Sequence, residues 1–197
     1  NESPIYGVDS VPFLTGGYAD SKKLYAAQKP FLEKRLASEG LILLYSVAWP
    51  PQGLYTKKEI KSVADLSGLK FRTYNAATSR LAQLVKAVPT QIEVPDIPTA
   101  FATGRVEAMI TSPSTGVDSK AWDFLTHYND LQGWQPRNIV FVNKDAFDKL
   151  TADQKKAVMA AAKTAETRGW AASEKETVDQ TKALVDNKIV VYKPTPE

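Results

Sequence analysis

The stretch Asp65–Asn75, DLSGLKFRTYN, holds the local pattern on which the fold and the function of this chain depend. A short turn at Ser67-Gly68 precedes a strand-like segment, and this segment ends in Arg72 before a polar loop and a helix. The planar donor groups of arginine match a carboxylate in a bidentate way, which lysine cannot do. We therefore expect Arg72 to hold the carboxylate of a small organic anion. The alternative is an ordinary surface arginine at a strand end.

Short strands and helices alternate on both sides of this stretch. Nearly continuous apolar sequence from Leu41 to Trp49 predicts a buried strand, and Pro50-Pro51-Gln52-Gly53 ends it. Further strands are predicted at 70–73, 90–94, 106–111, 127–134, 138–143 and 188–192, with helices at 75–85, 96–104 and 144–150. This alternation is typical of an α/β fold with parallel strands.

The rest of the chain is predicted to be loops, two short helices and one long helix. The expected ranges are an extended entry at 1–18, helices at 20–28 and 30–40 separated at Pro30, and a loop at 112–116. Thr151-Ala152-Asp153-Gln154 has the form of a capping box, and no proline follows it before about Asp186. The predicted helix is roughly 50 Å long, with a kink expected near Gly169.

Composition excludes several classes of function. The net charge of +3 is spread over the chain without a basic stripe, so no nucleic-acid partner is expected. The absence of cysteine excludes disulfides, cysteine-ligated zinc and thiol catalysis, and a single histidine, His127, disfavours metal sites and Ser-His-Asp triads. We expect no catalytic residue, no metal and no cofactor.

Several segments, taken together, resemble the solute-binding proteins of TRAP (tripartite ATP-independent periplasmic) transporters of the DctP type. In order and spacing they cover most of residues 41–190. They are DLSGLKFR at 65–72 with AAT at 76–78, AFATGRVEA at 100–108, NIVFVNK at 138–144, and LTADQ at 150–154, which opens the long helix. The resemblance implies a two-lobed α/β fold of the periplasmic-binding-protein type (type II), with a ligand cleft between lobes and a long helix that spans both lobes.

The resemblance also implies a domain organisation. Residues 1–49 form part of lobe I, 50–137 form lobe II, 138–170 return to lobe I and start the long helix, and 171–197 end that helix and add a last strand on lobe II. Because members of the family are usually longer, we expect the first lobe to be incomplete in this chain. The chain begins at Asn1 without a signal peptide and is interpreted as a mature or trimmed piece of an exported, periplasmic protein.

Family members grip the ligand carboxylate with the arginine at the position of Arg72. Where many members have a supporting asparagine, this chain has Thr111 and Ser112, and where some have a second arginine it has Gln52. The predicted ligand-binding residues are Arg72, Trp49, Gln52, Tyr74, Asn75, Thr111, Ser112 and Trp134. For the two tryptophans, packing in the core is the alternative to stacking on the ligand, and for Asn75 the alternative is a helix cap.

The resemblance implies a binding protein that captures a small organic acid and delivers it to the membrane permease of a TRAP transporter. One arginine with neutral neighbours favours a monocarboxylate, either with an aromatic or bulky apolar part or as a 2-oxo or 2-hydroxy acid. Two alternatives remain open. The chain could be a ligand-sensing domain of a signalling system, or an α/β enzyme that acts on a carboxylic acid, although it lacks the Gly-x-Ser-x-Gly motif and a phosphate-binding glycine loop.

Overall fold

The computed structural model describes residues 3–194, and the chain divides into two compact units. Unit 1 comprises the described residues up to Trp49 together with Trp134–Lys175, and unit 2 comprises Pro50–Gly133 and the described residues from Glu176 on. Sequence analysis placed the boundaries after residues 49, 137 and 170, whereas the contacts within the chain place them after 49, 133 and 175. The assignment of these units to lobes of a ligand-binding protein stays a prediction.

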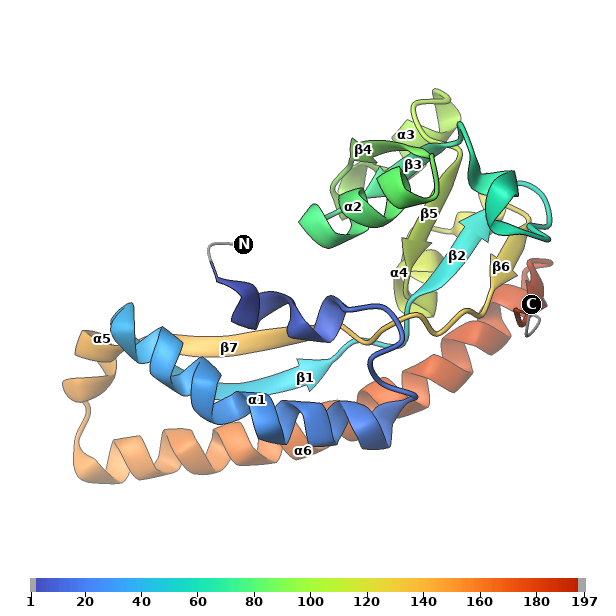
Figure 1. Cartoon of the computed structure of the whole chain (residues 1–197). Coiled ribbons are helices and arrows are strands. Elements are labelled where there is room, and N and C mark those ends of the chain that lie inside the picture. The colour runs from blue at the N-terminus through green and yellow to red at the C-terminus, as the bar shows by residue number, and fades with distance from the viewer. Residues whose placement is uncertain (1–2, 195–197) are drawn as a thin grey trace. The chain divides into compact units, whose positions relative to one another are not determined.

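Unit 1 contains a two-stranded antiparallel sheet against which two long helices pack (Figure 1). Its elements are the 3-10 helix η1 (Pro4–Ser10), α1 (Tyr18–Ser38), β1 (Leu41–Ala48), β7 (Arg137–Asn143), α5 (Lys144–Asp148) and the first part of α6 (Ala152–Asp186). Tyr25, Leu32 and Leu36 of α1 form a buried core with Leu43 of β1 and Trp170 of α6. The predicted capping box is confirmed, because Thr151 and Gln154 exchange hydrogen bonds at the start of α6.

Two predictions for the N-terminal region were wrong. Residues 4–10 form η1 instead of an extended entry, and a single helix, α1, replaces the two helices that Pro30 was expected to separate. A proline inside a helix removes one backbone hydrogen bond and costs about 3 kcal/mol. The helix continues here because Tyr25, before Pro30, and Leu32 and Leu36, after it, are buried in the same core.

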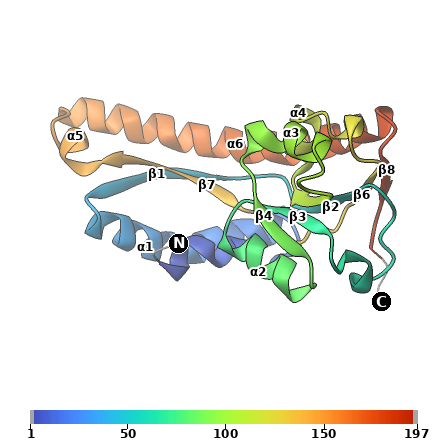
Figure 2. The same ribbon diagram turned by 90° about the horizontal axis from the view of Figure 1, so that it is seen from above.

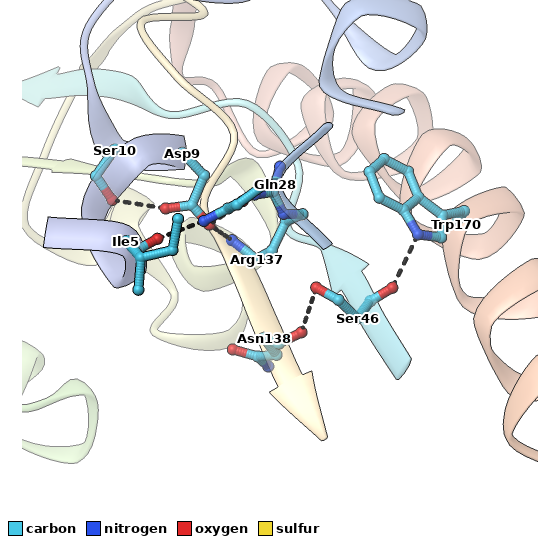
Figure 3. Close-up of polar contacts among 8 residues, drawn as sticks. All are labelled: Ile5, Asp9, Ser10, Gln28, Ser46, Arg137, Asn138 and Trp170. Atoms are coloured by element: carbon cyan, nitrogen blue, oxygen red, sulfur yellow. Dashed lines mark hydrogen bonds and ion pairs between the residues drawn. The ribbon is translucent and has the colours of Figure 1, made fainter. Parts of the chain in front are cut away.

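Two side chains of α6 hold the backbone of β1 at Ser46. The amide of Ser46 donates to Oε1 of Glu166 at 3.1 Å. The indole Nε1 of Trp170 donates to the carbonyl of Ser46 at 2.9 Å (Figure 3). The Ser46 hydroxyl donates to the carbonyl of Asn138 on β7 at 2.9 Å. Glu166 and Trp170 are four residues apart and therefore lie on the same side of the helix. In most strands the backbone amide and carbonyl form hydrogen bonds with a neighbouring strand. At Ser46 both groups bond to side chains of α6 instead.

Gly169 allows the close approach of α6 to β1, because a Cβ atom at this position would lie 2.6 Å from Cγ2 of Val47. We expect Gly169→Ala to lower the free energy of unfolding by about 1–3 kcal/mol through overpacking, although alanine is the better helix former. Urea unfolding monitored by tryptophan fluorescence measures the change. Val47→Ala creates room, so Gly169→Ala should be neutral or stabilising in that background. An equal loss in both backgrounds would contradict this interpretation.

Unit 2 contains a six-stranded mixed sheet with the order β4-β3-β5-β2-β6-β8. Figure 2 shows α2 on one side of this sheet and α3 and α4 on the other. The elements besides the end of α6 are β2 (Gly53–Thr56), η2 (Val63–Leu66), β3 (Lys70–Thr73), α2 (Ala76–Leu84), β4 (Val88–Gln91), η3 (Val94–Asp96), α3 (Ile97–Ala102), β5 (Ala108–Thr111), α4 (Pro113–Asp118), η4 (Ala121–Asp123), β6 (His127–Asn129) and β8 (Val190–Tyr192).

The sheet of unit 2 corrects the expectation of parallel strands. The pairs β3–β4, β3–β5 and β6–β8 are parallel, but β2 is antiparallel to both of its neighbours. Sequence analysis missed β2 because the two prolines before it indicate a turn. All four residues of β2 are buried, and Gly53 is required because a Cβ there would lie 2.4 Å from the Tyr128 ring and hydroxyl.

Two further predictions for unit 2 were wrong. Residues 112–116, expected to be a loop, are the N-cap and the first residues of α4, where Ser112 is the N-cap and Pro113 occupies the first turn. The strand predicted for 127–134 ends at Asn129. In the described part of the chain, residues 3–194, no helix has both the length and the apolar character needed to cross a membrane.

Candidate functional site

Polar residues gather at one edge of the sheet in unit 2. The parallel strands β3 and β5 end at this edge, and the antiparallel strand β2 begins there, because Gly53 pairs with Thr111. The residues next to these strand ends are Tyr74, Ser112 and Gln52. In α/β proteins, ligand-binding groups collect at the carboxyl ends of parallel strands. Six of the eight predicted ligand-binding residues belong to unit 2: Arg72, Gln52, Tyr74, Asn75, Thr111 and Ser112.

Arg72 lies in β3 and is only 2% exposed, so it is not a surface arginine. Its Nε donates to the carbonyl of Ile92 at 2.9 Å, and its guanidinium carbon lies 5.1 Å from the centre of the Tyr74 ring. Burial lowers the pKa of the Arg72 guanidinium from its usual value, while Tyr74 and Glu93 raise it. An arginine nevertheless stays protonated in proteins. Within residues 3–194, no carboxylate forms an ion pair with this buried cation.

Tyr74 and Gln52 are hydrogen-bonded to each other beside Arg72. The hydroxyl of Tyr74 donates to Oε1 of Gln52 at 3.2 Å, and Nε2 of Gln52 donates to the carbonyl of Pro50 at 3.2 Å. Gln52 is buried, with 4% of its surface exposed. The neutral side chain of Gln52 therefore lies in the same network as the cationic group that was expected to bind the ligand.

The side chains of Asn75 and Ser112 cap helices. Oδ1 of Asn75 accepts the amide of Thr78 at 2.8 Å at the start of α2, and Oγ of Ser112 accepts the amide of Thr115 at 3.2 Å at the start of α4. The cap that was the alternative reading of Asn75 is therefore present. Thr111 is buried at the end of β5. Direct contact of these three residues with a ligand stays a prediction.

Trp49 and Trp134 belong to unit 1. The backbone amide of Trp49 donates to the carbonyl of Pro136 at 2.8 Å, and its indole Nε1 donates to Oδ1 of Asn138 at 3.0 Å, while part of the ring is exposed. Trp134 is buried. Stacking of either ring on a ligand stays a prediction, as does packing in the core as the alternative.

Sequence analysis did not identify Arg137 as a second buried arginine. Its side chain is 1% exposed, its Nη2 lies 3.7 Å from Oδ2 of Asp9, and its backbone amide donates to the same oxygen at 2.9 Å. Nη2 also donates to Oε1 of Gln28, whose Nε2 donates to the carbonyl of Ile5 (Figure 3). The available signal was the spacing of Ser21, Tyr25 and Gln28, which puts polar side chains on the buried face of α1.

Ionisable groups of the kind that bind metals are not clustered. Within residues 3–194, no three His, Asp or Glu side chains come together as a metal site would require. The one histidine, His127, lies in β6, where its Nδ1 shares a 2.8 Å hydrogen bond with the hydroxyl of the preceding residue, Thr126.

Comparison with known proteins connects this geometry to one family. The sequence model of the DctP family, described as bacterial extracellular solute-binding protein, family 7, matches residues 1–197. DctP7 of Bordetella pertussis, an extracytoplasmic solute receptor binding pyroglutamic acid, is 45% identical, with a TM-score of 0.97 over 100% of this chain and 65% of that protein. DctP6 of the same organism, described in the same words, is 44% identical, with a TM-score of 0.98 over 100% and 65%.

A third similar structure is a TRAP solute-binding protein from a marine metagenome, specific for pyroglutamate and solved with co-purified pyroglutamate. It is 40% identical, with a TM-score of 0.95 over 100% of this chain and 64% of that protein. The chain thus spans slightly less than two thirds of the length of these proteins. The matched structures share its α/β fold and are solute receptors, not enzymes.

Proposed function

Because this chain belongs to the DctP family of bacterial extracellular solute-binding proteins, we propose that it binds a small monocarboxylic acid, pyroglutamate above all, through the guanidinium of Arg72. The observation that carries the proposal is the burial of Arg72 without a carboxylate partner among residues 3–194. A buried charge is costly unless it is paired. A ligand carboxylate supplies that pair, and the planar guanidinium binds it through two parallel hydrogen bonds.

The choice of pyroglutamate is supported by three similar proteins, 40–45% identical, whose structures were solved as pyroglutamate-binding receptors. Pyroglutamate carries one carboxylate on a compact lactam ring, which agrees with the single arginine and the neutral Gln52 at this sheet edge. A second carboxylate would have to be buried without a second cation from Gln52, which is unfavourable. We therefore expect dicarboxylates to bind less tightly.

The transport role is the second part of the proposal. The protein resides in the periplasm and delivers its ligand to the permease of a TRAP transporter, as expected from the family and from the similar TRAP solute-binding protein. A ligand-sensing role would use the same binding site. Uptake of radiolabelled pyroglutamate by cells, with and without the gene for this protein, distinguishes the two roles, because only the transport role predicts loss of uptake.

Thermal-shift measurements on the full-length protein test the ligand. At a pyroglutamate concentration 100 times Kd, binding to the folded state adds about 2.7 kcal/mol to the free energy of unfolding and raises Tm. The comparison panel contains 2-pyrrolidinone, which lacks the carboxylate, glutarate as a dicarboxylate, and phenylacetate and lactate as the other predicted monocarboxylate types. A larger shift with glutarate, or an equal shift with 2-pyrrolidinone, would contradict the proposal.

A further inference from the structure

We propose that Tyr74 and Gln52 are positioning residues, which orient Arg72 and couple it to two of the three segments that connect unit 2 to unit 1. This inference rests on the proposed function of Arg72. It assigns these two residues a role different from the direct ligand contact expected from the sequence. The contacts that connect Arg72, Tyr74 and Gln52 all lie within unit 2.

The guanidinium of Arg72 is held from two directions. Its Nε–H bond to the carbonyl of Ile92, at 2.9 Å, fixes one edge of the planar group. The ring of Tyr74, whose centre is 5.1 Å from the guanidinium carbon, attracts the cation and limits its movement on that side. Bidentate binding of a carboxylate depends on the direction of the plane. The position of the Tyr74 ring therefore affects how well Arg72 binds its ligand.

Gln52 in turn fixes the position of Tyr74. Oε1 of Gln52 accepts the Tyr74 hydroxyl at 3.2 Å, and its Nε2 donates to the carbonyl of Pro50 at 3.2 Å. The amide group of this buried side chain thus has a protein partner at each end. A side chain engaged in this way orients its neighbour, which is the function that we assign to Gln52.

The backbone of Gln52 is bonded to residues at two of the three connections between the units, those at 49–50 and 133–134. Unit 2 begins at Pro50, and its first segment ends at Gly133. The amide of Gly133 donates to the carbonyl of Gln52 at 2.9 Å, so Gln52 is bonded to residues of these two connections. A change in the backbone of either connection changes the position of Gln52, and through Tyr74 the position of the guanidinium. By linkage, carboxylate binding at Arg72 must then stabilise one arrangement of the connections.

Single-group substitutions in the full-length protein test this coupling. Tyr74→Phe keeps the ring over Arg72 but removes the hydroxyl. Gln52→Leu removes both the acceptor of that hydroxyl and the donor to the carbonyl of Pro50, with little change in volume. Each should weaken pyroglutamate binding about 3- to 10-fold, the effect of one lost hydrogen bond. Both substitutions break the same chain of contacts. The affinity of the double variant for pyroglutamate should therefore be no lower than that of the single variant with the lower affinity. Isothermal titration calorimetry measures the affinities.

Hydrogen–deuterium exchange provides a readout that a purely structural role would not change. Pyroglutamate should slow amide exchange at Gly133 in the wild type and have a smaller effect in Tyr74→Phe. Tyr192→Phe is the matched control, because the Tyr192 hydroxyl accepts the amide of Ile60 at 3.0 Å and lies outside this chain of contacts. Its affinity for pyroglutamate and its exchange at Gly133 should equal those of the wild type. Thermal unfolding without ligand confirms that each variant is folded.

The possible outcomes separate this inference from the function on which it rests. Wild-type affinity in both single variants, or additive losses in the double variant, overturns the positioning role while pyroglutamate binding through Arg72 stands. If the wild type does not bind pyroglutamate, or if Arg72→Lys binds it as tightly as the wild type, the proposed function fails and the positioning role fails with it.

Discussion

Arg72→Lys is expected to lower the affinity for pyroglutamate by about 2–5 kcal/mol, or roughly 30- to 4,000-fold. Lysine keeps the positive charge but loses the planar pair of donors, the contact of the guanidinium with the Tyr74 ring and the Nε–H bond to the carbonyl of Ile92. The substitution therefore tests the geometry of the guanidinium separately from its charge. Isothermal titration calorimetry of the full-length protein measures the loss.

Arg80→Lys is the matched control for this substitution. Arg80 is exposed in α2, eight residues after Arg72, and its replacement should leave the affinity unchanged. Circular dichroism and thermal unfolding in the absence of ligand show whether both variants fold like the wild type. Equal pyroglutamate affinities in Arg72→Lys and the wild type would show that the carboxylate is bound elsewhere.

Arg137→Met is expected to lower the free energy of unfolding at pH 7 by about 3–5 kcal/mol, because it leaves a buried carboxylate without its cation. The carboxylate of Asp9 loses the partner 3.7 Å away, and Oε1 of Gln28 loses its donor. Urea unfolding measures the change. Lys144→Met is the control, since it breaks the exposed ion pair with Asp148 and should change the free energy of unfolding little. If both variants lost a similar amount of stability, the burial of the Asp9–Arg137 pair would not explain the effect of Arg137→Met.

The pH dependence of the Arg137→Met effect identifies its cause. Burial raises the pKa of the Asp9 carboxyl above its usual value, although Arg137 lowers it. A carboxyl with a raised pKa in the folded state stabilises the protein fully below its unfolded value of about 3.9, and this contribution is lost as the pH rises through the folded pKa. Without Arg137 the folded pKa of Asp9 rises further, so the loss of stability should be largest at neutral pH and shrink on acidification.

The double variant Asp9→Asn/Arg137→Met isolates the charge of Asp9. It carries no buried charge at either position, so its stability relative to Asp9→Asn should not change between pH 7 and pH 5. A loss in Arg137→Met that is independent of pH would instead point to lost packing of the arginine side chain against Tyr25.

Features that depend on local sequence could be predicted. The capping residues Asn75 and Thr151 mark the starts of α2 and α6 as expected, because a cap requires only the few residues that follow it. The α/β class and the DctP family could also be predicted, since ordered motifs such as DLSGLKFR carry them. The strand around Arg72 has the predicted limits, Lys70–Thr73.

Features that depend on contacts between distant segments could not be predicted. The helix α1 continues through Pro30 because of the core beneath it, and β2 forms because β5 and β6 lie on its two sides. The partners of Arg137, at positions 9 and 28, are more than one hundred residues away in the sequence. The ligand-binding role of Arg72 stays a prediction from the sequence. The contact between Tyr74 and Gln52 became visible only once the end of β3 and the start of β2 were placed at the same sheet edge.

The interleaved order of the two units has a consequence for biosynthesis. During translation, β1 is synthesised long before β7, the only strand with which it pairs in the described part of the chain. In the same way, β6 is synthesised long before its partner β8, which begins at Val190. Pairing between strands that are far apart in the sequence is slow, and it leaves apolar side chains exposed to solvent until late in folding. The β1–β7 and β6–β8 pairs therefore form only after residues 143 and 192, respectively, have been synthesised.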